Sequence, residues 1–176
     1  STIKNKKAVI VSFIEGNNIH LPNTSHCFKI GKMIGRLHDI TKNFGEKKNN
    51  ILDFLELKKI FLKSKNTNDE KFKEIFNTLE SEIQFLEKSW PKKLPSGIIH
   101  ADLFKDNIFF SEEEISGVID FYFSCYHFLL YDIALVVNDW CFENNGENFN
   151  ISFFKSIIEG YSLSRSLNEN EMNALN

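Results

Sequence analysis

The sequence predicts an α+β fold that is dominated by helices and built as one domain. Apolar residues recur at helical spacing between residues 72 and 86, whereas residues 108–110 and 115–119 are short β-prone runs. A length of 176 residues suits a single domain with one sizeable core, and a hydrophobic content of 42% is ordinary for a globular protein.

The first elements that the sequence predicts are a strand and a helix. Residues 8–13 form a strand-like run. Asn23 or Thr24 can cap a helix that runs to about Ile40, and His38 near its end is expected to be a packed, hydrogen-bonded structural residue. The apolar stripe of this helix, and the glycines that permit a close neighbour, are Phe28, Ile34, Leu37, Gly31 and Gly35.

Two more helices are predicted before the centre of the chain. Residues 51–62 are a helical candidate, and the next helix carries an apolar stripe that we expect to lie in the core. The stripe consists of Phe72, Ile75, Phe76, Leu79, Ile83 and Leu86. Residues 90–97 contain two prolines, which break the helix and lead into a short buried strand at Ile98 and Ile99.

The second half of the chain is predicted to begin with a β-hairpin. The polar residues 111–114 separate its two strands, 108–110 and 115–119. Residues 121–131 are aromatic and lack a regular period, and residues 131–140 are predicted to form a helix. A final amphipathic helix carries Phe154, Ile157, Ile158 and Tyr161.

The most informative motif is His100-x-Asp102-x-x-x-x-Asn107, which is followed by Asp120 at the end of an apolar run. Phosphoryl transfer needs a carboxylate for the attacking hydroxyl, and then hard oxygen ligands for magnesium. Asp102 can orient a hydroxyl, while Asn107 and Asp120 offer an amide oxygen and a carboxylate. A hairpin between Asn107 and Asp120 would return the chain and set these two side chains side by side.

Other interpretations of this motif are weaker. His-x-Asp occurs by chance, and a lone Asp after an apolar run is often a cap or turn residue, but the ordered set with hairpin spacing favours a functional site. Metal-dependent hydrolysis by His100 and Asp102 is disfavoured, because no further cluster of His or carboxylates completes a ligand set. His100 is expected to support the loop by hydrogen bonding.

The segment 99–107 resembles the catalytic segment of the aminoglycoside/choline-type phosphotransferases, which are small-molecule relatives of protein kinases. Together with residues 117–125, 131–134 and 138–143, it is similar more narrowly to the homoserine kinases of that superfamily. Upstream, Phe13-Ile14-Glu15-Gly16 and Gly31 to His38 also resemble the hinge and the first large-lobe helix. The resemblance runs from about Val9 to Tyr161 and is weakest between Lys42 and Lys71.

The resemblance implies a protein-kinase-like fold, represented mainly by its α-helical C-terminal (large) lobe with a catalytic β-hairpin. Residues 1–16 would be the end of the small lobe and the hinge, and residues 17–176 the large lobe. The N-terminal small lobe is expected to be largely absent, because the chain contains no G-x-G-x-x-G or comparable phosphate loop. We therefore expect a chain that is truncated at both ends, and that could be inactive by itself.

The resemblance also implies an activity: transfer of the γ-phosphoryl group of ATP, with Mg²⁺, to the side-chain hydroxyl of L-homoserine, which gives O-phospho-L-homoserine on the route to threonine. Asp102 would be the catalytic residue, Asn107 and Asp120 would hold the metal, and His100 and Asp132 would support the catalytic loop. The residues expected to face the nucleotide are Ser12, Phe13 and Ile14, and those expected to face the acceptor are Tyr126, His127, Asn138 and Trp140.

Two alternatives stay open. Another hydroxyl kinase of the superfamily is one, and a choline kinase would favour an aromatic cage, whereas homoserine needs partners for an ammonium and a carboxylate. The carboxylate partners cannot be chosen from the sequence. A non-catalytic binding protein that has kept a kinase lobe is the other, although the intact Asp102, Asn107 and Asp120 argue against it.

Composition limits the partners. The net charge is −3 with no basic stripe, which argues against nucleic acid as a main partner. The longest apolar run is far shorter than a membrane span of about 18 residues, so no membrane partner is expected. Three widely spaced cysteines, Cys27, Cys125 and Cys141, suggest reduced thiols and a cytoplasmic location rather than a disulfide framework or a zinc site.

Overall fold

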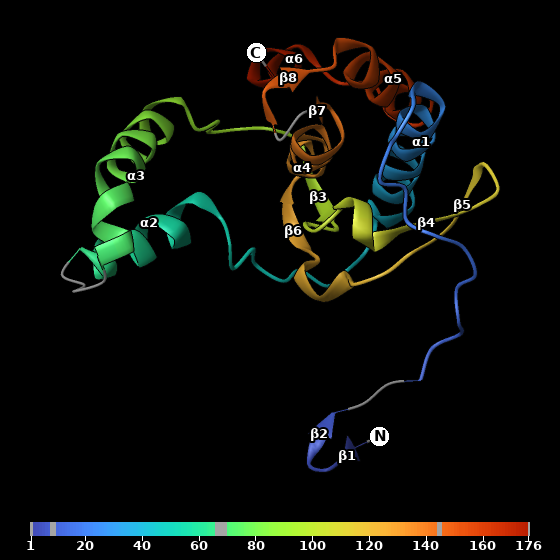
Figure 1. Cartoon of the computed structure of the whole chain (residues 1–176), viewed down its shortest axis with the longest axis horizontal. Coiled ribbons are helices and arrows are strands. Elements are labelled where there is room, and N and C mark those ends of the chain that lie inside the picture. The colour runs from blue at the N-terminus through green and yellow to red at the C-terminus, as the bar shows by residue number, and fades with distance from the viewer. Residues whose placement is uncertain (1, 8–9, 66–69, 144–145, 176) are drawn as a thin grey trace.

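The computed structural model of the chain describes residues 2–7, 10–65, 70–143 and 146–175. It is a mixed α+β structure in which helices predominate (Figure 1). The helices are α1 (Thr24–Thr41), α2 (Phe54–Ser64), α3 (Glu70–Ser89), α4 (Leu130–Trp140), α5 (Ile151–Ser162) and α6 (Glu169–Ala174), with short 3-10 turns η1 (Lys105–Asn107) and η2 (Phe121–Phe123). The strands of the described residues form antiparallel pairs: β1 (Thr2–Ile3) with β2 (Lys6–Lys7), β3 (Ser96–Ile99) with β6 (Cys125–Phe128), β4 (Ile108–Ser111) with β5 (Glu114–Val118), and β7 (Phe142–Glu143) with β8 (Asn148–Phe149).

Helices α1 and α5 lie side by side at very short range (Figure 1). A Cβ atom at Gly31 would lie 2.0 Å from the carbonyl oxygen of Ile157, and one at Gly160 would lie 2.0 Å from that of Phe28. Only glycine leaves room for a backbone at this distance. The close neighbour that the glycines of α1 predict is therefore α5.

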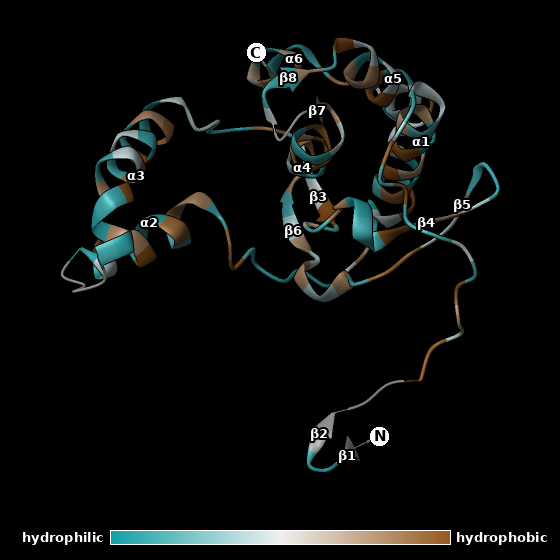
Figure 2. Cartoon of the chain, viewed as in Figure 1, coloured by the Kyte–Doolittle hydropathy of each residue, from teal (hydrophilic) through white to brown (hydrophobic). Residues whose placement is uncertain are grey.

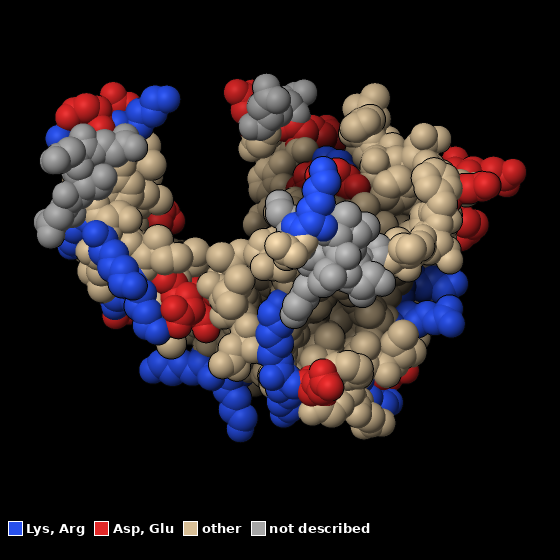
Figure 3. All heavy atoms as spheres, turned by 90° about the horizontal axis from the view of Figure 1, so that it is seen from below, with Lys and Arg blue, Asp and Glu red and all other residues tan. Residues whose placement is uncertain are grey.

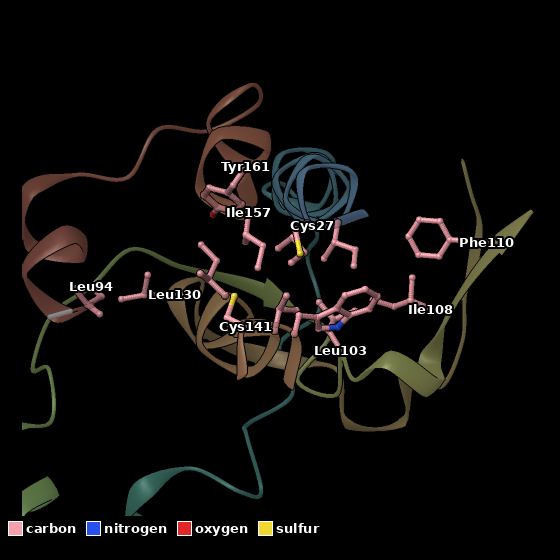
Figure 4. Close-up of a cluster of buried hydrophobic side chains, with 14 residues drawn as sticks. Cys27, Leu94, Leu103, Ile108, Phe110, Leu130, Cys141, Ile157 and Tyr161 are labelled. Atoms are coloured by element: carbon pink, nitrogen blue, oxygen red, sulfur yellow. The ribbon is translucent and has the colours of Figure 1, made fainter. Parts of the chain in front are cut away.

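The core lies between the α1–α5 pair and helix α4, and it extends to strand β4 (Figure 4). Cys27 of α1 and Cys141 at the end of α4 direct their sulfur atoms into this space. Leu103 belongs to the same cluster and is fully buried, although it lies in the loop after β3. This contact fixes the loop of the His-x-Asp motif to the centre of the molecule.

Helices α2 and α3 form an arm that stands away from the rest of the molecule (Figure 1). Phe61 of α2 stacks on Phe76 of α3 at 5.1 Å between ring centroids, and Lys65 pairs with Glu80 at 2.9 Å. The apolar stripe of α3 meets α2, but no described residue of α3 is buried, so its expected place in the core is wrong. Figure 2 shows hydrophobic and hydrophilic residues alternating along both helices of the arm.

Several predicted boundaries change in the structure. The strand predicted at 8–13 is wrong for residues 10–13, which pair with no other strand, and residues 8–9 lie outside the described residues. A strand needs a hydrogen-bonded neighbour, and the side chains of Ile10 and Phe13 are 96% and 90% exposed instead. The helix predicted from residue 51 begins at Phe54, because the Asp53 carboxylate accepts a hydrogen bond from the Glu56 amide at 2.8 Å and caps it.

Other predictions are confirmed, and strand β6 and helix α6 are among the elements that the sequence does not predict. The Asn23 cap of α1, the hairpin β4–β5 and the helices at α4 and α5 are present as expected. Strand β6 lies within the aromatic segment 121–131, and α6 begins with a capping box between Asn168 and Glu171. The predicted strand at 98–99 is longer, because it pairs with β6 from Ser96 onward.

Charges are mixed over the surface. Lysines, arginines and acids are interspersed on the arm and on the body in the face that Figure 3 shows. The three cysteines are buried free thiols. None of the described helices combines the length and the apolar content that crossing a bilayer requires.

Candidate active site

The loop between β3 and β4 brings Asp102 and Asn107 together. The Asn107 side-chain nitrogen donates hydrogen bonds to the Asp102 carbonyl oxygen at 2.8 Å and to its carboxylate oxygen Oδ2 at 2.9 Å. Asn107 is buried and Asp102 is half-buried. The amide nitrogen therefore orients the carboxylate, and the amide oxygen is the atom of Asn107 that remains for a cation.

The Asp132 side chain stabilises the start of this loop through hydrogen bonds to its backbone. It is fully buried in the first turn of α4, and its carboxylate accepts hydrogen bonds from the backbone nitrogens of His100 and Ala101, both at 2.8 Å. Ala101 has a left-handed backbone with φ of 64°, which is unfavourable for a residue other than glycine. The two bonds to Asp132 stabilise that conformation and so set the direction of Asp102.

His100 connects the loop to the strand that carries Asp120. Its ring nitrogen Nε2 donates to the carbonyl oxygen of Ile119 at 2.9 Å, and its ring lies 4.4 Å from that of Phe121. The imidazole is completely buried. Nε2 is thus directed to the segment between β5 and η2, while Nδ1 has no hydrogen-bond partner among the described residues.

A backbone hydrogen bond brings the segment that carries Asp120 next to Asn107. The Ile119 amide donates to the Asn107 carbonyl oxygen at 3.0 Å, and Asp120 follows in a left-handed conformation with φ of 61°. Its carboxylate is exposed and makes one long hydrogen bond, from the Tyr122 amide at 3.4 Å. The hairpin thus returns the chain to Asn107 as the sequence predicts, and leaves the Asp120 oxygens open to solvent.

The donor set suits magnesium. Magnesium prefers oxygen ligands and keeps several waters or phosphate oxygens, so one amide oxygen and one carboxylate are sufficient from the protein. The described residues contain no group of three or more His, Cys, Asp or Glu side chains that could enclose a metal by themselves. Asn107 and Asp120 therefore fit an ion that is shared with phosphates, and not a site closed by the protein alone.

A chain of polar contacts connects Asp132 to Glu171 of α6. His38 of α1 contacts the Asp132 carboxylate through Nε2 at 3.1 Å, and its Nδ1 contacts the Tyr161 hydroxyl at 2.9 Å. Arg165 donates to that hydroxyl at 2.8 Å and to both carboxylate oxygens of the fully buried Glu171 at 2.8 Å. Since a carboxylate only accepts, the His38 nitrogen Nε2 is the donor in its contact with Asp132.

The residues predicted to face an acceptor lie in two places. Tyr126 and His127 are in β6, where His127 lines a cavity of about 440 Å³ beside the arm, and burial lowers the pKa of its imidazole. Asn138 and Trp140 are at the end of α4 and line a different cavity of about 740 Å³. Trp140 is only 1% exposed and also belongs to the core.

The residues predicted to face the nucleotide lie in the segment that precedes the backbone contact between Asn17 and Phe110 of β4. Ser12 and Phe13 are exposed, whereas Ile14 packs against Gly117 of β5. Ile14 thus lies next to β5, the strand that precedes Asp120.

Two residues outside the motif, Asp139 and Asn18, also hold its turn, and sequence reasoning did not select them for this role. The Lys105 backbone nitrogen donates to the Asp139 carboxylate at 2.7 Å, and its side-chain nitrogen donates to the Asp139 carbonyl oxygen at 2.6 Å. Asn18 donates from its side chain to three carbonyl oxygens of the same turn, those of Lys105, Asp106 and Ile108. No local pattern indicates these pairs, because 34 or more residues separate the partners.

The sequence is similar to known kinases along nearly its whole length. A homoserine kinase from Agrobacterium fabrum is 40% identical over 173 residues, which are 98% of this chain and 53% of that protein. One from Sinorhizobium medicae is 38% identical over 174 residues, 99% of this chain and 53% of that protein. The chain thus spans about half the length of these relatives.

Solved structures show the same fold. An aminoglycoside-3'-phosphotransferase of type VIII superposes with a TM-score of 0.69 at 16% identity and covers 92% of this chain, which matches 64% of that one. Choline kinase from Cryptosporidium parvum has a TM-score of 0.57 at 21% identity, with coverages of 92% and 57%. A spectinomycin phosphotransferase in complex with AMP has a TM-score of 0.62 at 18% identity, with coverages of 92% and 56%.

The model of the APH phosphotransferase enzyme family matches residues 4–163, which include the whole loop with Asp102 and Asn107, the hairpin to Asp120 and the brace at Asp132. The chain therefore belongs to the phosphotransferase enzyme family.

Proposed function

We propose that this protein is a homoserine kinase, which transfers the γ-phosphoryl group of ATP to the side-chain hydroxyl of L-homoserine and gives O-phospho-L-homoserine on the route to threonine. The observation that carries the proposal is the 40% identity to a homoserine kinase over 98% of the chain. The contact between Asp102 and Asn107 supports it, because a phosphotransferase needs an oriented carboxylate next to a metal ligand.

Asp102 is the group that acts on the acceptor in this proposal. Its carboxylate orients the acceptor hydroxyl and takes its proton, while the hydroxyl oxygen forms a bond to the γ-phosphorus. The bond between that phosphorus and the bridging oxygen breaks, and ADP leaves with the electron pair. Asn107 keeps the carboxylate in place, and Asp132 and His100 keep the loop in place.

Asn107 and Asp120 would hold Mg²⁺ through the amide oxygen and the carboxylate. A bound magnesium ion would neutralise charge on the phosphates during transfer. The exposed, weakly hydrogen-bonded carboxylate of Asp120 is available for this role.

We also propose the two-part division of the chain, with residues 1–16 as the end of the small lobe and the hinge, and residues 17–176 as the large lobe. Asn17 exchanges two backbone hydrogen bonds with Phe110, at 2.8 and 2.9 Å, directly after Gly16, whose φ is 130°. The backbone of Ser12 to Ile14 would face the adenine ring of a bound nucleotide, and a spectinomycin phosphotransferase of the same fold is an AMP complex. A cytoplasmic location, which the three free thiols favour, stays a prediction.

The test uses the complete gene product, so that a small lobe is present if the gene encodes one. It is incubated with Mg-ATP and a panel of L-homoserine, choline, an aminoglycoside and serine, and the products are identified by mass spectrometry. We expect phosphohomoserine from the wild type. Asp102→Asn keeps the size of the side chain but removes the carboxylate, and we expect turnover to fall by a factor of about 100 or more.

Other outcomes decide between the alternatives. A phosphorylated product from a different acceptor would keep the phosphotransferase mechanism and reject homoserine as the substrate. Equal turnover by Asp102→Asn and the wild type would reject Asp102 as the catalytic residue. Magnesium-dependent ATP binding without any product would favour a lobe that binds nucleotide but does not catalyse.

A further inference from the structure

A cavity of about 740 Å³ opens beside the catalytic loop, between η1 and the end of α4. Its volume is in the range of small-molecule sites, which is roughly 300–1,000 Å³. A second cavity of about 360 Å³ shares Lys105 and Asp139 with it, and continues along η1 to Phe104 and Asp106. The two hollows together follow the loop from the neighbourhood of Asp102 to the start of β7.

Lys105 and Glu143 give the larger cavity charges of both signs. The Lys105 side chain is 23% exposed, and it uses one of its three donors on the Asp139 carbonyl oxygen. Its ion pair with the Asp139 carboxylate is long, at 3.8 Å, so donors remain for an anion in the cavity. Glu143 of β7 accepts a hydrogen bond from Asn150 at 2.8 Å and keeps further acceptor capacity for a cation.

Trp140 forms the wall between this cavity and the core. It lines the cavity, it is 1% exposed, and its indole nitrogen has no hydrogen-bond partner among the residues that the structure describes. A buried N–H without a partner is unfavourable by several kcal/mol in an apolar environment, so such groups are normally paired. The Lys105 side-chain nitrogen lies 5.9 Å from the centre of the same ring. The indole nitrogen is itself buried, so the group on this wall that can reach a carboxylate is the Lys105 ammonium.

We propose that this cavity binds the backbone groups of an amino-acid acceptor, with Lys105 binding its α-carboxylate and Glu143 its α-ammonium. The inference rests on the proposed function and assigns the carboxylate partners that sequence reasoning could not choose. Three peptide bonds separate Asp102 from Lys105, so their Cα atoms are at most about 11 Å apart. Asp102 itself lines neither cavity, but the smaller one ends at Phe104, whose amide donates to the Asp102 carbonyl oxygen at 2.9 Å, so the hydroxyl end of the acceptor is expected on that side.

The test compares three acceptors in the complete gene product. L-homoserine carries both charges, 3-amino-1-propanol lacks the carboxylate, and 4-hydroxybutyrate lacks the ammonium. In Lys105→Met we expect the KM for homoserine to rise about tenfold or more, which is the loss of one charged hydrogen bond, while the kinetics with 3-amino-1-propanol stay within about twofold. In Glu143→Gln we expect the corresponding loss for homoserine but not for 4-hydroxybutyrate.

Lys58→Met is the matched control. Lys58 is 28% exposed and paired with Glu87 in the arm, so it resembles Lys105 in exposure and pairing but lies outside the cavity. An unchanged KM for homoserine in Lys105→Met would overturn the proposal. An equal loss of kcat with all acceptors would also overturn it, because Lys105 would then only maintain the loop.

Calorimetric titration of homoserine into the same proteins separates this proposal from the proposed function. Binding that weakens about tenfold in Lys105→Met, without turnover by the wild type, would keep the binding site and reject homoserine phosphorylation. Turnover of homoserine with equal binding by both proteins would keep the function and reject the site.

Discussion

At the scale of single residues, the structure explains why a fully buried carboxylate is tolerated at Asp132. Its two oxygens accept from the His100 and Ala101 amides and from His38, so each oxygen has a donor. A buried charge is stable only when it is paired and hydrogen-bonded in this way. The same contacts fix the left-handed Ala101 and thus the direction of the loop that carries Asp102.

Asp132→Asn should therefore destabilise the fold by about 3 kcal/mol, because an amide must turn its NH₂ group toward at least one of these donors. Urea denaturation followed by circular dichroism measures the change. Asp39→Asn is the control, since Asp39 is an exposed carboxylate on α1 that pairs only with Lys42 among the described contacts, and its loss should change stability by less than about 0.5 kcal/mol. Equal midpoints for the two variants would show that the Asp132 contacts do not hold the loop.

Sequence reasoning could find Asp102, Asn107 and Asp120, because their spacing along one loop and one hairpin is local. The Asp132 position was implied by resemblance, and its contacts agree with the expected brace. The continuation through Tyr161 was not predictable, because His38 and Tyr161 are 123 residues apart and meet only when α1 packs on α5. Tyr161 had been assigned to the apolar stripe, and its hydroxyl gives no signal in the sequence.

At the scale of elements, the helices were predicted well wherever caps and stripes agreed. Asn23 caps the N-terminus of α1, and the apolar stripe of α5 places Ile157 against α1. The edges of short strands were harder, because strand β6 depends on pairing with β3 and not on its own alternation. The same dependence explains why residues 10–13, which are apolar but have no partner strand, do not form one.

Gly31→Ala should separate α1 from α5. The new Cβ would lie 2.0 Å from the Ile157 carbonyl oxygen, and a backbone atom cannot move aside as a side chain can. We expect the free energy of unfolding to fall by roughly 3 kcal/mol, in the range of overpacked cores. Gly45→Ala is the matched control, since no heavy atom lies within 4 Å of its Cβ position, and it should leave stability unchanged or slightly raised. Thermal unfolding of both variants checks this, and a Gly31→Ala protein as stable as Gly45→Ala would mean that the helices are less tightly packed.

At the scale of the whole molecule, the core contains several groups that are neutral at ordinary pH and can lose a proton only at high cost. Burial raises the pKa of the Cys27 and Cys141 thiols to about 12, and it raises the pKa of the Tyr161 hydroxyl to about 12. Both sulfur atoms face the space between α1 and α4 (Figure 4). These groups belong to the cluster that also holds Leu103, so their titration reports on the packing behind the loop that carries Asp102.

Stability should therefore fall as the pH rises above about 9. Below pH 9 the two thiols are protonated in both states and contribute no pH dependence. Between pH 9 and 12 the unfolded chain loses these protons near the ordinary pKa of 9.0, while the folded chain retains them, so the unfolded state binds fewer protons and the free energy of unfolding decreases. Each thiol should lower the free energy of unfolding by about 1.4 kcal/mol between pH 8 and pH 10.

Urea denaturation at the two pH values measures this loss in the wild type and in the double variant Cys27→Ala/Cys141→Ala. The double variant has a lower free energy of unfolding at both pH values because of the cavities. Its free energy of unfolding should, however, fall by about 3 kcal/mol less than that of the wild type between pH 8 and pH 10. Equal losses in the two proteins would mean that the two thiols ionise in the folded core as freely as in water.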